Sequence, residues 1–178
     1  AYYAYAQRYA VLLAAKGVTL DIMTSAGSHQ NLERIEKGEA DIAFVQGGIV
    51  SPAVGEDEEE GPLRSLGSVS YEPVWVFYRG ERRVDKLHQL AGQRIAVGED
   101  GSGIRGLALS LLEANEIPAN SPNLLPIAGL TAAEALQQGQ IDAAFIVAAQ
   151  EAPLVQVMLR SPGLRVVSLS QAEAYLRR

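Results

Sequence analysis

A glycine-rich turn at 98–106 carries the residues best suited to hold a small anion. It reads GEDGSGIRG, follows the apolar run 94–97 and precedes leucines at helical spacing over 107–112. A strand, a glycine turn and a helix in this order leave the first N–H groups of the helix unpaired. The turn therefore predicts an anion site at Gly101, Ser102 and Gly103. Arg105 is either a further partner for a carboxylate or a solvated helix residue.

A second small polar turn, Gly27–Ser28 followed by Asn31, lies in the first half of the chain. The simplest interpretation makes Ser28 and Ser102 the N-caps of the helices that follow. Capping and anion binding are compatible, because both use the N-terminus of a helix. The two turns together favour ligand binding.

The spacing of apolar residues and the positions of glycine and proline predict the helices and strands that position these turns. The first half predicts helices over 2–15 and 31–37 and strands over 18–23 and 41–46, the second strand buried on both faces. Tyr2, Tyr5 and Tyr9 share the packed face of the first helix. A loop follows over 47–62, with a solvated acidic run at 56–60. Residues 63–79 are expected to form an extended segment that crosses between the two halves of the chain and is interrupted by Pro73. Trp75 in this segment is expected to be a core residue.

The second half repeats this organisation. We expect strands over 94–97, 124–127, 141–147 and 164–169, and helices over 104–115, 132–138, 151–160 and 171–178. Thr131 and Glu134 have the spacing of a capping box. The stretches 31–44 and 132–145 both read helix, glycine, polar residue, apolar residue, aspartate and strand with phenylalanine. Two α/β lobes built alike account for this parallel.

Composition excludes several classes of protein. The chain has 178 residues, 48% apolar and 20% charged, with a net charge of −6 and no cysteine. The apolar fraction supports a folded core, and the acidic balance argues against nucleic-acid binding. His29 and His88 lack metal-ligand spacing and are expected at the surface, so no metal or other cofactor is predicted. The letters GxGxxG occur at 101–106, but the acid expected about 20 residues on in a dinucleotide site is missing.

Five segments in order carry a resemblance to a known family. They are SAGSHQNL at 25–32, GEADIAFVQ at 38–46, LAGQRIAVG at 90–98, GSG at 101–103 and GQIDAAF at 139–145. Together they resemble the TAXI family of solute-binding proteins, the receptors of TRAP-type transporters. The resemblance implies a type 2 periplasmic-binding-protein fold, with two α/β lobes joined by crossing strands and a small solute in the cleft. The expected domains are 1–72 for lobe one, 73–163 for lobe two and 164–178 returning to lobe one.

The resemblance also implies which residues face the solute. On lobe one these are Gly27, Ser28 and Asn31 in the loop, with Gln46 and Gly47 at the end of the next strand. Tyr71 and Glu72 match the crossing strand, Gly101, Ser102 and Gly103 match the anion-holding turn of lobe two, and Phe145 matches the strand end opposite. Ile104 departs from the pattern, because a hydroxyl residue, usually threonine, often follows GSG in the family.

The implied function is capture of a small anionic or zwitterionic solute, such as glutamate or a dicarboxylate, outside the cytoplasm for membrane transporter subunits. Family chains are longer, so we expect this sequence to lack segments at both ends, and related chains can carry a membrane anchor. An exposed sheet edge of lobe one could then pair with a second copy. Two alternatives stay open: an enzyme or sensor on the same scaffold, with Glu72 as the nominated carboxylate, or a receptor-like domain with a degenerate site.

Overall fold

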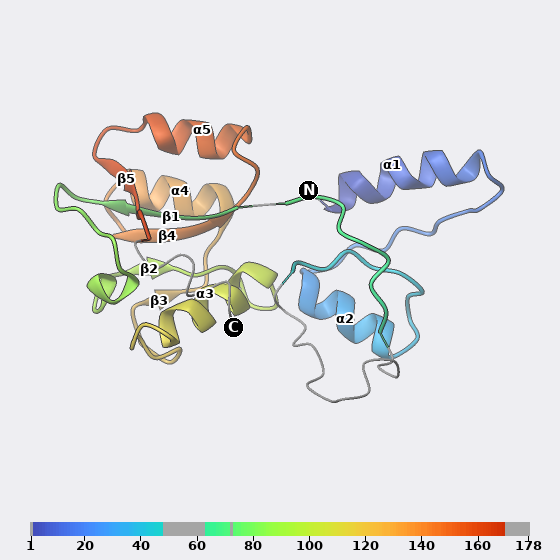
Figure 1. The fold of residues 1–178 in the computed structure, drawn as a ribbon, viewed down its shortest axis with the longest axis horizontal. Helices are drawn as coiled ribbons and strands as arrows, with labels where there is room; N and C mark the ends of the chain where they lie inside the picture. The colour runs from blue at the N-terminus through green and yellow to red at the C-terminus, as the bar shows by residue number, and fades with distance from the viewer. Residues whose placement is uncertain (1, 48–62, 72, 170–178) are drawn as a thin grey trace.

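The chain forms two lobes that meet near the starts of α2 and α3 (Figure 1). The computed structural model describes residues 2–47, 63–71 and 73–169. The first lobe contains α1 (Tyr2–Ala14) and α2 (Ser28–Glu36). The second lobe contains a sheet with helices on both faces. The predicted helices over 2–15 and 31–37 are therefore confirmed, the second one starting three residues early.

The second lobe is built on a mixed five-stranded sheet in the order β3-β2-β4-β1-β5. β2 (Ile95–Ala96) is parallel to β3 (Leu124–Leu125) and to β4 (Ala143–Val147). β1 (Val74–Arg79) runs antiparallel to β4 and to β5 (Leu164–Val166). The strands predicted in the second half all form, although β2, β3 and β5 are shorter than expected.

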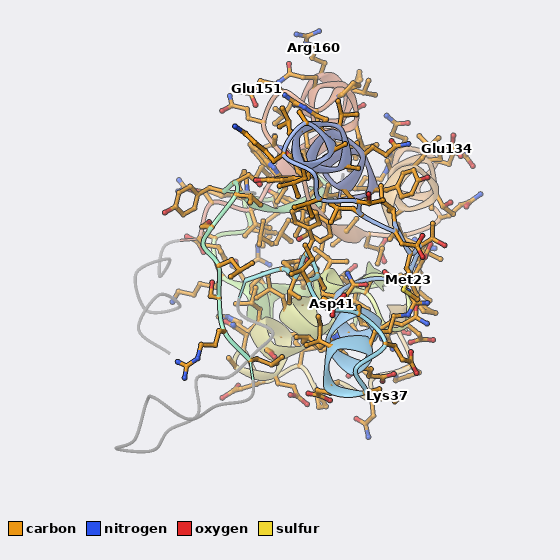
Figure 2. The ribbon with its side chains drawn as sticks, turned by 90° about the vertical axis from the view of Figure 1, so that its right-hand side faces the viewer. Met23, Lys37, Asp41, Glu134, Glu151 and Arg160 are labelled. Carbon is orange, nitrogen blue, oxygen red and sulfur yellow. The ribbon has the colours of Figure 1, made fainter. Side chains whose placement is uncertain are left out.

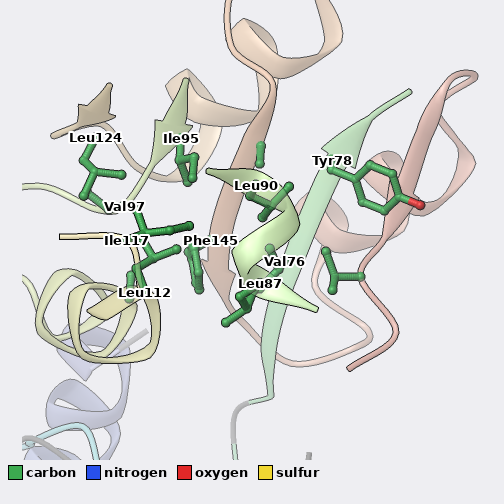
Figure 3. Close-up of a cluster of buried hydrophobic side chains, with 13 residues drawn as sticks. Val76, Tyr78, Leu87, Leu90, Ile95, Val97, Leu112, Ile117, Leu124 and Phe145 are labelled. Atoms are coloured by element: carbon green, nitrogen blue, oxygen red, sulfur yellow. The ribbon is translucent and has the colours of Figure 1, made fainter. Parts of the chain in front are cut away.

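Alternate residues of the strands feed two separate cores, as a pleated sheet requires. Val76, Ile95 and Phe145 point to the core shared with α3 (Gly103–Glu113) and the 3-10 helix η1 (Leu87–Leu90), shown in Figure 3. Phe77 and Ala144 point to the opposite core, shared with α4 (Gly129–Gln137) and α5 (Pro153–Arg160). This three-layer packing fixes the position of the turn between β2 and α3.

Helix α4 begins at Gly129, two residues before the predicted N-cap Thr131. The backbone N–H of Ala132 already donates to the carbonyl of Ala128. Thr131 thus lies inside the first turn, and the predicted capping box with Glu134 is wrong. The ring of Trp75 stacks on that of Phe77 and its Nε1 donates to the Ala148 carbonyl, which confirms that it packs against the core.

The strands predicted over 18–23 and 41–46 do not form among the described residues. Side chains of α2 bond to the backbone here: Asn31 donates to the Phe44 carbonyl within 41–46, and Arg34 donates to the Thr24 carbonyl directly after 18–23. Ile42 is 55% exposed, so burial on both faces is wrong for 41–46. Phe44 instead receives the three rings of Tyr2, Tyr5 and Tyr9 at centroid distances of 5.8, 6.1 and 5.9 Å.

The segment that joins the lobes is strand only from Val74 onward. Residues 63–71 form no ladder, so the long strand predicted over 63–79 is confined to β1. Leu164–Val166, assigned from the sequence to the returning segment, pairs with β1 in the second lobe. The helix predicted over 171–178 lies outside the described residues. Within the described ranges, no helix is both long and apolar enough to cross a membrane.

An ion pair joins the beginnings of β2 and β4. The Arg94 Nη2 lies 2.8 Å from Asp142 Oδ1, and the backbone N–H and Nε of Arg94 donate to Oδ2 at 2.9 and 3.0 Å. Arg94 also donates to the Gly139 carbonyl. The hydrogen bond from the Arg94 side chain holds the pKa of Asp142 below its ordinary value, against the opposing effect of partial burial.

Asp142→Asn is expected to lower the free energy of unfolding at neutral pH. Because the folded-state pKa of Asp142 is lowered, its contribution is complete above the unfolded pKa of about 3.9 and is lost as the pH falls through the folded value. Urea unfolding of both proteins between pH 3 and 7 measures this. The control is Asp41→Asn, the matching aspartate of the first half, which is exposed on the first lobe (Figure 2).

The stability gap between wild type and Asp142→Asn should be constant at neutral pH and shrink in acid, and at neutral pH it should exceed the gap for Asp41→Asn, which removes an exposed carboxylate. A gap that widens as the pH falls would contradict the assignment.

Candidate functional site

The two glycine turns predicted from the sequence touch each other across the lobes. A Cβ placed on Gly27 would lie 3.1 Å from the Gly101 carbonyl oxygen and 3.1 Å from the Ser102 Cα. Gly27 also has φ 148° and ψ −163°, a conformation that other residues rarely adopt. Glycine is therefore required here both for the backbone conformation and for the close approach of the second lobe.

The hydroxyl of Ser28 does not cap α2. Ser28 is 1% exposed, and its Oγ accepts the backbone N–H of Gln46 at 3.0 Å. Asn31 lies one turn later, and its Nδ2 donates to the Phe44 carbonyl at 2.8 Å. These bonds tie the extended segment 41–46 to α2 and bring Gln46 beside the Gly27–Ser28 turn. Of the residues predicted on lobe one, Gly27, Ser28, Asn31 and Gln46 thus lie together.

The hydroxyl of Ser102 does not cap α3 either, because it donates to the Glu99 carbonyl at 2.6 Å. Gly27 and Ser102 are the N-cap residues of α2 and α3, and no side-chain cap bond is found at either one in the described structure. Ser102 therefore occupies the N-cap position that the sequence allowed but makes no side-chain cap, whereas Ser28 is the first residue of α2 and not its N-cap. The first-turn N–H groups of two helices, with their partial positive charge, are left in one region.

Arg105 folds back onto its own turn. Its Nε lies 3.0 Å from Asp100 Oδ1, and its Nη1 donates to the Gly98 carbonyl at 3.3 Å. The Arg105 side chain is 25% exposed and that of Asp100 is 82% exposed. The guanidinium is therefore half-buried beside the contact between the lobes, with an exposed carboxylate as its partner.

Ile104, which replaces the expected hydroxyl residue, packs against the core of the second lobe. A Cβ on Gly98, whose φ is +102°, would lie only 2.6 Å from the Ile104 Cγ2. The Ile104 side chain thus closes the inside of the turn and faces away from the first lobe.

The remaining predicted residues are not all gathered at the contact. Gly47 is exposed at the end of the segment that carries Gln46, and Tyr71 is 93% exposed on the segment that joins the lobes. Phe145 is 1% exposed inside the core of Figure 3, where its ring packs against neighbouring side chains. Glu72 lies outside the described residues. Solute contacts of these four residues stay predictions.

His29 contributes a contact that the sequence did not predict. A Cβ on Gly106 would lie 3.2 Å from the His29 Cε1, so the imidazole of α2 lies against the first turn of α3. His29 was expected at the surface, and it is exposed, as is His88. The only signal in the sequence was its position next to Ser28. In the described residues, His, Asp and Glu side chains form no group of three that could hold a metal ion.

Comparison of the sequence with models of known families identifies the family of this chain. The sequence model of the NMT1-like family matches residues 1–175. The chain belongs to the NMT1-like family.

Comparison with solved structures identifies the fold of this NMT1-like chain. An ancestral arginine-binding protein bound to arginine matches with a TM-score of 0.55 and 12% identity over 90% of this chain and 66% of that one. This likeness shows the periplasmic-binding-protein fold, as the sequence predicted.

Two further solved proteins are less similar in structure. ArtJ of Geobacillus stearothermophilus, which binds arginine, lysine and histidine, has a TM-score of 0.49 and 15% identity over 93% of this chain and 65% of its own. The periplasmic aliphatic sulphonate binding protein SsuA of Escherichia coli has a TM-score of 0.44 and 23% identity over 54% of this chain and 31% of its own. The NMT1-like chain thus spans 31–66% of the length of these three proteins.

Gly27→Ala is expected to push the lobes apart, because the added methyl meets backbone atoms that cannot rotate away. Gly80→Ala is the matched control: Gly80 has φ +143°, and a Cβ there meets nothing within 4 Å. Both variants carry a comparable backbone strain, of order 1–3 kcal/mol.

Spin labels on Lys37→Cys and Glu113→Cys, at the C-terminal ends of α2 and α3, report the separation by pulsed electron resonance, since the chain has no cysteine of its own. The mean distance should increase for Gly27→Ala and stay at the wild-type value for Gly80→Ala. Equal distances in the two variants would show that the contact does not hold the lobes together.

Proposed function

We propose that this protein is a solute receptor that holds a small carboxylate or amino acid between its two lobes. The observation that carries the proposal is the meeting of two helix N-termini whose N-cap residues make no side-chain cap. Two such termini, one from each lobe, offer N–H donors and positive potential to one anion. A carboxylate bound there would join the lobes without a metal or a cofactor.

The solute-facing residues we propose lie on the two turns. Gly27, Ser28, Asn31 and Gln46 build the side contributed by the first lobe. Gly101, Ser102, Gly103 and Arg105 build the side contributed by the second lobe, and Arg105 supplies the positive charge. The net charge of the whole chain is −6, so a carboxylate is attracted by these local groups and not by the overall field.

Binding of the solute would change the separation of the two lobes. The close approach at Gly27 leaves no room for a solute between the Gly27 Cα and the Ser102 Cα. A solute must therefore enter beside this contact or separate it, and the segment before β1 can absorb the change by hinge bending. The solute-bound arrangement is the form that membrane partners would recognise.

The finer assignment rests on the motifs that resemble the TAXI family. We propose that the partner is a TRAP-type transporter, that the protein works outside the cytoplasm, and that the solute resembles glutamate or a dicarboxylate. This is a binding role without catalysis. Pairing of two copies through the first lobe stays a prediction, since the structure describes no strand there.

A thermal shift series tests the proposal. L-glutamate, L-glutamine, succinate, L-arginine and methanesulfonate are added singly to the protein after dialysis against denaturant and refolding. A solute at 100 times its Kd should stabilise the fold by about 2.7 kcal/mol, which raises the Tm by several degrees.

L-glutamate or succinate should raise the Tm, and methanesulfonate should not. A rise with arginine alone would contradict a solute that resembles glutamate or a dicarboxylate, and no rise with any carboxylate or amino acid would contradict the proposed receptor role.

A further inference from the structure

We infer that Asp100 is an internal competitor for the solute's carboxylate at Arg105, and that it sets how strongly the site prefers anionic solutes. This inference rests on the proposed function. In the structure Asp100 Oδ1 lies 3.0 Å from the Arg105 Nε and so occupies a guanidinium donor that a solute carboxylate would need.

The position of Arg105 on α3 supports this role. Residues three and four apart share one face of a helix, so Ser102 and Gly106 face the same way. Both meet the first lobe: Ser102 lies against Gly27, and Gly106 lies against His29. Ile104 points to the core on the opposite side. Arg105 therefore flanks the face of α3 that meets the first lobe.

The two partners of this ion pair differ in how they are held. The Arg105 guanidinium is held in place by the Gly98 carbonyl as well, and only a quarter of the side chain is exposed. The Asp100 side chain is 82% exposed and loses little by returning to water. A solute carboxylate can therefore displace Asp100 while Arg105 stays where it is, which makes Asp100 the movable partner.

Competition of this kind acts on charged solutes and not on neutral ones. An exposed ion pair is worth at most about 1 kcal/mol, so displacing Asp100 weakens anion binding by a factor of about five or less. Glutamine and glutamate share their α-carboxylate, so the contrast applies where the side-chain group of the solute faces Arg105: a neutral amide there leaves the Asp100–Arg105 ion pair intact and meets no such penalty. Asp100 thus lowers the preference for glutamate over glutamine.

The experiment measures the Kd of L-glutamate and of L-glutamine by calorimetry for wild type, Asp100→Asn and Glu99→Gln. Glu99 is the matched control: it is an exposed acid on the same turn, and removing either carboxylate changes the net charge equally. Asp100→Asn should bind glutamate about two- to fivefold more tightly than Glu99→Gln does, with no matching gain for glutamine. The gain should shrink in 0.5 M NaCl.

Measurements in an Arg105→Gln background distinguish competition for Arg105 from a structural role of Asp100 in the turn. In Arg105→Gln, adding Asp100→Asn should no longer improve glutamate binding beyond Glu99→Gln. The inference is overturned if Asp100→Asn binds glutamate no more tightly than Glu99→Gln does, or if the gain in glutamate affinity persists in the Arg105→Gln background. The proposed function stands in either case. If wild type binds neither probe, the proposed solute class fails and the inference fails with it.

Discussion

The close contact between Gly27 and the Gly101–Ser102 turn sets how the two lobes meet. Backbone atoms of the two lobes approach so closely that a single methyl group at position 27 would collide with them. The three-layer second lobe holds the β2–α3 turn in place from one side. The bonds from Asn31 and Ser28 to the segment 41–46 hold the α2 turn from the other. Two helix N-termini therefore meet through backbone atoms, with the imidazole of His29 against Gly106 beside this contact.

The second lobe could be predicted from the sequence because its strands pair with one another and its helices cover both faces of the sheet within the described chain. Apolar strands such as Ala143–Val147 find partners on both sides, and Leu112 and Leu136 cover the two faces. The first lobe could not be predicted as well. A strand needs a neighbour to receive its hydrogen bonds, and the stretches over 18–23 and 41–46 pair with no strand in the described structure; the Phe44 carbonyl accepts from Asn31 of α2 instead. Sequence pattern reports propensity for a strand and not the presence of its partner.

The candidate site was predictable at the level of the backbone and not at the level of the side chains. Glycines after an apolar strand locate the turns at 27–28 and 101–103, since few other residues allow that geometry. The direction of each side chain depends on neighbours far apart in the sequence. The hydroxyls of Ser28 and Ser102 serve other partners, Arg105 pairs with Asp100, and the missing hydroxyl at Ile104 matters less because this residue faces the core. The resemblance placed Phe145 among the solute contacts; its side chain is 1% exposed in the core, and its solute contact stays a prediction.

The central claim is that the two turns form one site for one solute. Amide chemical shifts recorded during a titration with L-glutamate test it most directly, because each turn reports through its own N–H groups. The amides of Ser28 and His29 should shift together with those of Gly103 and Arg105, along one binding curve with one Kd. Shifts confined to one of the two turns, or two curves with different Kd values, would contradict the account.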